Sequence, residues 1–380
     1  MINIDFEIYD PFQNFDKVKD IWTTLLKKCP HSYYLSWQWR ELWLKTLPQS
    51  TDLFLVAGYK KGCPVIGFFL GRKIKTRSKF IKFYEVSLNS TLDPYYDLLW
   101  IEYNSILMDP DVTVPLEYIL RNLPVEWDDF HMTRFAPIYN KGLNMKLGTS
   151  YEIHVTDLKA YNVDLDMVRD NKDYLSLISP KKRYQIRRSI KEYEKMGEVK
   201  ITAAKDVDEA LAIYEELIDL HQKRWTERGQ PGTFSNSYYT DFNKKLISTR
   251  FEHGEIEIVR ITAGEQLLGC LYCFVFEGKV YGYMCGFNFL DSHLYSPGLI
   301  CHYFAVLHNT ARGLSCYDFL EGDYAYKKSL TTGHNIMQHI HIRKMSLKYK
   351  VWKMIYSMVG SLRKKNDTET GERAPTHRFA

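Results

Sequence analysis

VYGYMCGF, residues 280–287, begins the stretch that decides the fold of this 380-residue chain. Its apolar residues alternate and include two glycines, a pattern that predicts a strand. After a polar loop, Ser296-Pro297-Gly298 predicts the start of a helix that ends near Gly313, because Ser is a preferred N-cap and Pro suits the first helical position. A short strand, Cys316–Leu320, then runs into the acidic segment EGDYAYK, residues 321–327. Strand, helix and strand in so short a span predict a right-handed parallel crossover.

This crossover predicts a functional site at one edge of the sheet. The helix beginning at Ser296 starts at the carboxyl end of the first strand, where free backbone N–H groups attract an anion. The acidic segment 321–327 opens at the same edge. If Gly282 or Gly286 marks a bulge, backbone N–H groups of the first strand become donors for a developing oxyanion.

Composition sets wide limits on function. The formal net charge is +5, and Lys and Arg cluster in residues 181–195 and 343–365. We therefore expect any anionic partner to bind at one of these clusters. Seven cysteines without framework spacing favour a reducing compartment, and the N-terminus lacks a signal-peptide pattern, so we expect a cytoplasmic protein. Cys270 and Cys273 lie three apart in an apolar run and face opposite sides of a strand, so no metal site is expected there.

The remaining pattern divides the chain into two similar halves. Each half shows helices, a hairpin, a further strand, a helix and a last strand, which favours two copies of one α/β unit, with two unrelated α/β domains as the alternative. The polar stretch 159–173 is interpreted as a domain junction. We therefore expect a first unit over residues 1–160, a second over 161–345, and a basic helix with a disordered tail over 346–380. The expected helices are 15–28, 36–47, 114–122, 181–196, 207–228 and 235–251, and the expected strands are 53–59, 65–70, 80–88, 129–135, 256–262 and 267–276.

A known family shares these features. An antiparallel meander followed by a parallel crossover resembles the GNAT acyltransferase fold. The second half is similar to the GNAT branch associated with bacterial cellulose and exopolysaccharide biosynthesis, which is related to the Fem-type peptidoglycan transferases. The first half matches only through its early Trp pattern and hairpin, as a degenerate first unit. The matching segments are Ser179–Arg183 with Arg187 and Arg188, Leu220-His221 with Arg224-Trp225, Gly229, Gly232 and Phe234, Tyr295–Gly298, and Asp318–Asp323 with Tyr326-Lys327.

Two departures from the family pattern stand out. Leu330 lies near the position where the family usually has a Trp, and Leu294–Gly298 replaces the glycine- and arginine-rich pyrophosphate loop of ordinary GNAT enzymes. The second departure leaves the donor open.

The resemblance implies fold, activity and substrates. The implied fold class is α/β, with tandem GNAT-like units that each have a mixed central sheet flanked by helices. The implied activity is acyl transfer from acyl-CoA, such as acetyl-CoA, without a metal, to an amine or hydroxyl of a cell-envelope or exopolysaccharide precursor. One alternative is a Fem-type transfer from aminoacyl-tRNA, against which stand the modest charge and the lack of a long heptad-patterned arm. The other is a non-catalytic scaffold.

Direct acyl transfer needs a base, an oxyanion hole and a proton for the leaving thiolate. Candidate base or acceptor-binding carboxylates are Asp318, Glu321 and Asp323. Tyr326 is the candidate proton donor and Lys327 the candidate partner of a phosphate or carboxylate. A purely structural cluster is the alternative, favoured for Asp318. Candidate donor-binding residues are Tyr283, Gly286, Ser296 and Gly298, with the pyrophosphate expected at the helix N-terminus.

Two helical surfaces are candidate substrate-binding elements. His221, Arg224, Trp225 and Arg228 share one helical face, which forms either a wall of the acceptor cleft or a packed structural face, and the loop 229–234 is a candidate lid. Arg183 and Arg187 form a basic stripe for phosphates or, alternatively, a solvated helix face.

The C-terminal segment has its own pattern. Its apolar residues repeat at helical spacing among many cations, which is typical of a helix docked on its own domain or, alternatively, lying on a membrane surface. These apolar residues are Leu347, Val351, Ile355, Val359 and Leu362.

Overall fold

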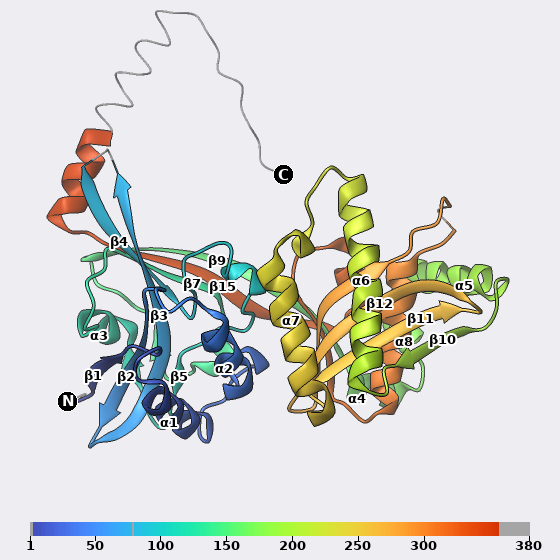
Figure 1. Cartoon of the computed structure of the whole chain (residues 1–380), viewed down its shortest axis with the longest axis horizontal. Coiled ribbons are helices and arrows are strands. Elements are labelled where there is room, and N and C mark those ends of the chain that lie inside the picture. Colours follow the sequence, from blue (N-terminus) through green and yellow to red (C-terminus); the bar gives the residue numbers. More distant parts are fainter. Residues whose placement is uncertain (1–2, 78–79, 293, 357–380) are drawn as a thin grey trace, which may run out of the picture.

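A computed structural model of the chain describes residues 3–77, 80–292 and 294–356. Its main feature is one mixed sheet of 13 strands in the described part of the chain, with helices packed against it. The strands follow the order β1-β2-β3-β4-β7-β15-β9-β14-β13-β12-β11-β10, with β5 paired to β3. Two α/β units thus share a continuous sheet (Figure 1).

The first unit is built around an antiparallel meander that ends in a parallel pair. Strand β4 pairs in parallel with β7 through Glu85–Asp129, Val86–Phe130 and Ser87–His131. Its elements are β1 (Asp5–Tyr9), α1 (Phe15–Leu26), α2 (Trp37–Thr46), β2 (Leu53–Lys60), β3 (Cys63–Arg77), β4 (Ile81–Leu88), β5 (Leu107–Met108), α3 (Leu116–Arg121) and β7 (Asp129–Phe135), with β6 (Val114–Pro115) and β8 (Leu143–Asn144) forming a small separate sheet.

The second unit repeats this order. Strand β13 pairs with β14 in parallel, which confirms the predicted crossover, and α8 connects the two strands. Its elements are α4 (Leu165–Asn171), α5 (Pro180–Glu194), β10 (Val199–Ala203), α6 (Val207–Glu227), α7 (Ser237–Arg250), β11 (Ile256–Ala263), β12 (Gln266–Phe276), β13 (Lys279–Phe287), α8 (Pro297–Ala311), β14 (Cys316–Glu321) and α9 (Ala325–Leu330). Helix α9 was not expected from the sequence.

Two long strands join the units by exchanging places. Strand β9 (Tyr151–Asp164) follows the first unit in the chain but pairs with β14 of the second. Strand β15 (Gly333–Lys344) follows the second unit but pairs with β7 of the first, and β9 and β15 pair with each other along their length. The cut between residues 160 and 161 therefore falls inside a strand.

The stretch 159–173, interpreted from its polarity as a junction, is regular structure. It contains the end of β9, helix α4 and Lys172, whose φ is +54°. Within this stretch Ala160, Tyr161 and Val163 of β9 are buried and the chain continues into α4, so its polar residues do not mark an irregular linker.

The parallel pairs of the two units end differently. In the second unit, β13 pairs with β14 only from Lys279 to Tyr281, after which β13 continues beside β12 and a gap opens toward β14. In the first unit, the corresponding gap between β4 and β7 is filled by Asn104. Its side chain donates to the carbonyl oxygens of Leu88 and Thr133, both at 3.1 Å, and its backbone bridges to the end of β7. The first unit's gap is closed and the second unit's gap is open.

Helices α1 and α2 bury an aromatic cluster in the first unit. Within it lies Arg40, which is fully buried. Its guanidinium group lies 4.9–5.8 Å from four ring centroids, and its nitrogen atoms have no hydrogen-bond partner among the described residues. The four rings belong to Trp22, Trp39, Trp43 and Phe69. Desolvation lowers the pKa of Arg40 well below its usual value.

A last helical segment, residues 347–356, packs beside the end of the β3–β4 hairpin (Figure 1). The rings of Trp352 and Phe83 meet there at 5.9 Å, and Lys348 donates to Asp128 at 2.5 Å. Val359, Leu362 and the expected tail lie outside the described residues. None of the helices in the described part has the length and apolarity needed to cross a membrane.

Candidate active site

The gap between β13 and β14 opens into a cavity of about 1400 Å³. Its wall comes mainly from the second unit: strands β13 and β14, the C-terminal part of α6, the first turns of α8, and the segment 321–327. The first unit contributes Leu98, Trp100, Glu102 and Arg134. The cavity therefore lies where the units meet, at the edge of the sheet predicted from the crossover.

Most of the predicted site residues line this cavity. They are Tyr283, Gly286, Ser296 and Gly298 from the donor set, Glu321, Asp323, Tyr326 and Lys327 from the catalytic set, and His221, Arg224 and Trp225 from the substrate set. The other three have different surroundings. Arg183 donates to the carbonyl oxygens of Leu175, Ser176 and Ile178, and Arg187 is exposed outside the cavity lining. Asp318 lies behind the wall.

Both carboxylate oxygens of Asp318 accept hydrogen bonds from neighbouring residues. One carboxylate oxygen accepts from the hydroxyl of Tyr103 and the other from the backbone N–H of Leu320 at 2.7 Å. Burial raises the pKa of Asp318 to about 6. These contacts make Asp318 a link between the units that fixes the end of β14.

Lys327 fixes the same strand end from the other side. Its buried ammonium group donates to the carbonyl oxygens of Phe319 and Glu321, both at 2.6 Å, and to that of Leu320 at 3.4 Å. Leu320 has a φ of +61°, a left-handed conformation that side chains rarely adopt. Burial lowers the pKa of Lys327. The strained turn by which β14 leaves β13 is therefore held by a cation at its carbonyl groups.

The two other carboxylates have polar partners. Glu321 forms an ion pair with Arg134 of β7 at 3.3 Å. Asp323 is exposed and accepts from the hydroxyl of Tyr161 on β9 at 2.7 Å. Both carboxylates are therefore candidates for contact with a cationic or hydroxyl-bearing acceptor.

Tyr326 presents its ring to the cavity from α9. The ring stacks on buried His302 of α8 at 5.7 Å and 14°, and burial raises the pKa of Tyr326 above its usual value. Nδ1 of His302 contacts the hydroxyl of Tyr317 at 3.1 Å, and burial lowers the pKa of His302 to about 3. The phenol therefore stays protonated at neutral pH beside a neutral imidazole.

The donor-binding candidates occupy the floor and one end of the cavity. Relative to β12, the register of β13 shifts between Gly282 and Met284 and leaves Tyr283 outside the ladder, which confirms a bulge near Gly282. Gly286 permits close packing, since a Cβ there would stand 2.5 Å from the carbonyl oxygen of Leu217 on α6. Ser296 occupies the N-cap position of α8, but its hydroxyl accepts from Gln185 at 3.0 Å and makes no capping bond.

Helix α6 forms a mixed aromatic and basic wall. The guanidinium group of Arg224 lies 4.3 Å from the ring centroid of Phe289, and the ring of His221 meets Phe234 edge-on at 4.9 Å. The adjoining loop, the predicted lid, also lines the cavity. Gln222 donates to the carbonyl oxygen of Pro231 at 2.9 Å and so holds this loop to α6.

Sequence reasoning missed the first unit's part of the site. Glu102 is only 7% exposed and lines the cavity, and its carboxylate accepts from the backbone N–H of Glu321 at 2.7 Å. Arg134 lies 4.0 Å from the same carboxylate. Neither residue stands in a motif, because the contacts that bring them to the site span about 200 residues. His302 was hidden in the apolar pattern of its helix.

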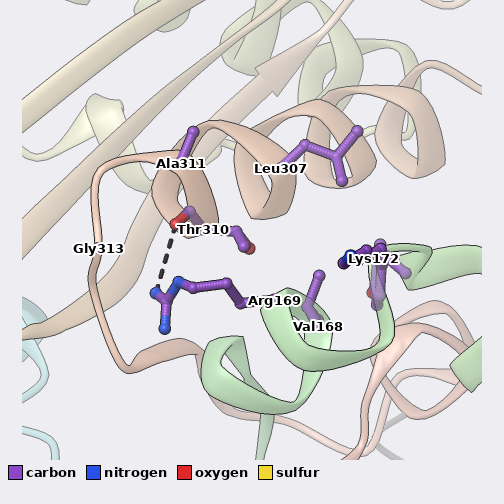
Figure 2. A pocket seen from close by; sticks show the side chains of 8 residues that line it. Val168, Arg169, Lys172, Leu307, Thr310, Ala311 and Gly313 are labelled. Carbon is purple, nitrogen blue, oxygen red and sulfur yellow. Dashed lines mark hydrogen bonds between the residues drawn. The ribbon is translucent and has the colours of Figure 1, made fainter.

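A smaller cavity, about 360 Å³, lies between α4 and α8 (Figure 2). There Arg169 donates to the carbonyl oxygens of Thr310 and Leu314 at 3.3 and 2.9 Å and so satisfies the C-terminal end of α8. This is a structural contact. In the described part of the chain, His, Cys, Asp and Glu side chains form no group of three suited to a metal ion.

Comparison with known proteins finds a family match within the second unit. Residues 180–328 match the family described as acetyltransferase (GNAT) domain. No protein of curated function matches the sequence. The match and the repeated topology confirm the expected fold class, tandem GNAT-like units, with the addition that both share one sheet.

Similar solved structures include FemX, at 12% identity and a TM-score of 0.47, covering 89% of this chain and 98% of that one. L-PGS from Bacillus licheniformis has 11% identity and a TM-score of 0.47, covering 91% and 96% of the two chains. A tandem GNAT protein from the clavulanic acid biosynthesis pathway has 10% identity and a TM-score of 0.45, covering 90% and 99%. Such distant likenesses leave the substrates open.

Proposed function

We propose that this protein transfers an acyl group from acyl-CoA, for example acetyl-CoA, to an amine or hydroxyl of a cell-envelope or exopolysaccharide precursor in the cytoplasm. The observation that carries the proposal is the gap where β14 leaves β13, because it opens into a large cavity with a helix N-terminus at one end and Tyr326 beside it. The envelope or exopolysaccharide class of acceptor rests on the family resemblance.

The donor fits the open gap. The first turn of α8 offers backbone N–H groups without intrahelical partners, which suit the pyrophosphate of CoA. Lys182 lines the cavity near this end and adds a positive charge. Beyond Tyr281, β13 loses β14 as its neighbour within the described residues, so its backbone polar groups on that edge are available to the amides of the pantetheine arm.

The reaction is a direct transfer. The acceptor nitrogen or oxygen attacks the thioester carbonyl carbon, and the new bond forms as its proton leaves to a base. The oxyanion is stabilised by backbone N–H groups of β13 near the bulge at Gly282–Met284. The carbon–sulfur bond then breaks, and Tyr326 gives its proton to the thiolate. Lys327 holds the carbonyl groups of β14 and keeps this gap open.

The acceptor enters from the side of the first unit and α6. Trp100, Trp225 and Phe289 are exposed aromatics in the lining and offer apolar surfaces for a sugar ring. Arg134 and Arg224 offer positive charge to phosphate or carboxylate groups on the same molecule.

A bulky residue at position 298 is expected to weaken CoA binding. A Cβ added at Gly298 would lie 3.3 Å from the ring of Phe287. Gly298→Trp therefore places a large side chain over the first turn of α8. Calorimetry with CoA should show affinity reduced at least about tenfold relative to the wild type, the loss of roughly one charge-assisted contact. Binding of aminoacyl-tRNA with no binding of CoA by the wild type would instead favour the Fem-type alternative.

We also propose peripheral contact with an anionic membrane through the helix 347–356 and the β3–β4 hairpin. Trp352 faces the hairpin and Tyr349 faces β9 and β15, which leaves an outward apolar stripe that includes Leu347, at 77% exposed, and Val351. Phe80 at the hairpin is 88% exposed. Lys82, Lys350 and Lys353, in the same two segments, are exposed. An apolar stripe within a basic rim matches the surface of an anionic bilayer.

Truncation after Met345 is expected to abolish co-sedimentation with vesicles that contain anionic phospholipid. The double variant Leu347→Glu/Val351→Glu should have the same effect without removing the helix, because it places charges in the apolar stripe. Met196→Glu, a change at an exposed apolar residue of the second unit, is the matched control. Equal sedimentation of wild type, truncation and double variant would contradict membrane contact.

A further inference from the structure

The segment that closes the first unit's gap also reaches the second unit's cavity. Asn104 fills the space between β4 and β7, and Glu102, two residues earlier, lines the cavity. Between them, Tyr103 donates its hydroxyl hydrogen to Asp318 of β14. The hydroxyl of Ser32 donates to the carbonyl oxygens of Glu102 and Tyr103 at 3.3 and 3.2 Å. The segment is thus fixed to both units at once.

Backbone strain gathers at the same place. Trp100, Tyr103, Arg134 and Leu320 have φ values of +42°, +49°, +49° and +61°, although none of them is glycine. Such conformations persist only where the surrounding structure holds them, and they cluster at functional sites. Here they surround Glu102, and three of the four belong to the first unit.

We propose that Glu102 is the general base of the second unit's active site, so that the first unit supplies a catalytic residue to the reaction. This proposal rests on the acyltransferase function proposed above. The carboxylate lies at the end of β14, against the N–H of Glu321, where the gap opens into the cavity. It takes the proton that the acceptor amine or hydroxyl loses as the bond to the thioester carbon forms. Tyr326 protonates the departing thiolate, and solvent returns the proton from Glu102 to Tyr326.

The surroundings tune Glu102 for this task. Burial raises the pKa of its carboxyl group to about 7, and the charge of Asp318 adds to that increase. The charges of Arg134 and Lys327 and the N–H of Glu321 act in the opposite direction. Glu321 itself pairs with Arg134. A base with a pKa near the working pH is the most effective proton acceptor.

Three variants test the proposal with acetyl-CoA as donor and glucosamine as acceptor, with CoA release followed through its thiol. Glu102→Gln keeps an oxygen to accept from Glu321 but cannot take a proton, so kcat/KM should fall by about 10²–10⁴ while CoA affinity stays unchanged. Glu102→Asp should restore part of the rate. Glu117→Gln is the matched control, since Glu117 also accepts a backbone N–H, from Gly148, and pairs with an arginine, Arg121, away from the cavity.

The pH profile separates a base from a structural carboxylate. Because only the ionised form accepts a proton, wild-type kcat/KM should rise with pH through about 7, and Glu102→Gln should lack this limb. Glu102→Asp should keep an acidic limb. This conservative variant serves as the test if Glu102→Gln fails to fold.

The possible failures are distinguishable. A Glu102→Gln rate near that of the wild type, or a slower rate with an unchanged acidic limb, would overturn the role of Glu102 alone. A wild type that neither binds acetyl-CoA nor releases CoA would overturn both this role and the proposed function.

Discussion

Tyr326→Phe is expected to lower kcat by a factor of about 10²–10⁴ while CoA affinity remains close to that of the wild type. The substitution removes one hydroxyl group and retains the ring, which stacks on His302 and Tyr324 at 5.7 and 6.1 Å. The cavity and the packing of α9 should therefore persist. The variant cannot donate a proton to the departing thiolate, and the thiolate is a poorer leaving group when it is not protonated.

The measurement is a comparison of kcat, CoA affinity and thermal stability for the same preparations. Tyr303→Phe is the matched control, because Tyr303 is another tyrosine of this unit that stacks on a ring, Tyr174 at 6.0 Å, outside the cavity lining. A purely structural cluster predicts a shared loss of stability with unchanged activity per folded molecule. Wild-type rates for both Tyr326→Phe and Glu321→Gln would move the proposed chemistry to His221 and Arg224.

The local part of this site could be predicted from the sequence because neighbouring residues create it. Pro297 and Gly313 bound α8, and the strand before it, the strand after it and the segment 321–327 are consecutive in the chain. The parallel pairing and the bulge near Gly282 follow from short-range signals. Most of the predicted site residues that the second unit contributes to the cavity lining could be found from such local signals.

The first unit's contribution could not be predicted, since it depends on contacts between distant segments. Glu102 meets Glu321 only because β9 and β15 exchange places and bring the two halves onto one sheet. Both strands contain a short alternation of polar and apolar residues, Glu152–Thr156 in β9 and His339–Arg343 in β15, but this local pattern does not indicate which strand of the other half each one pairs with. The role expected of Lys327, contact with a phosphate or carboxylate, remains a proposal, and its three carbonyl partners point to fixing β14 as well.

Arg40→Met is expected to raise the free energy of unfolding by about 1–4 kcal/mol, the range found when buried ion pairs are replaced by apolar side chains of similar volume. Arg40 is fully buried, and its guanidinium nitrogens have no hydrogen-bond partner in the described part of the chain. Removing such a charge from water costs several kcal/mol. Methionine keeps an unbranched, adaptable chain among the same rings.

The aromatic rings around Arg40 offset only part of this cost. A desolvated cation–π contact contributes about 2 kcal/mol, and contacts of one cation with several rings are not additive. Chemical denaturation of Arg40→Met, of Arg40→Ala and of the control Arg72→Met separates charge from packing. Arg40→Ala leaves a cavity and should be less stable than Arg40→Met. Arg72 lies 5.2 Å from the ring of Phe54 but pairs with Asp52, so its loss should change stability little. A destabilised Arg40→Met would mean that the cation–π contacts or a bound anion outweigh the desolvation cost, and only a bound anion would make the wild type's stability depend on phosphate concentration.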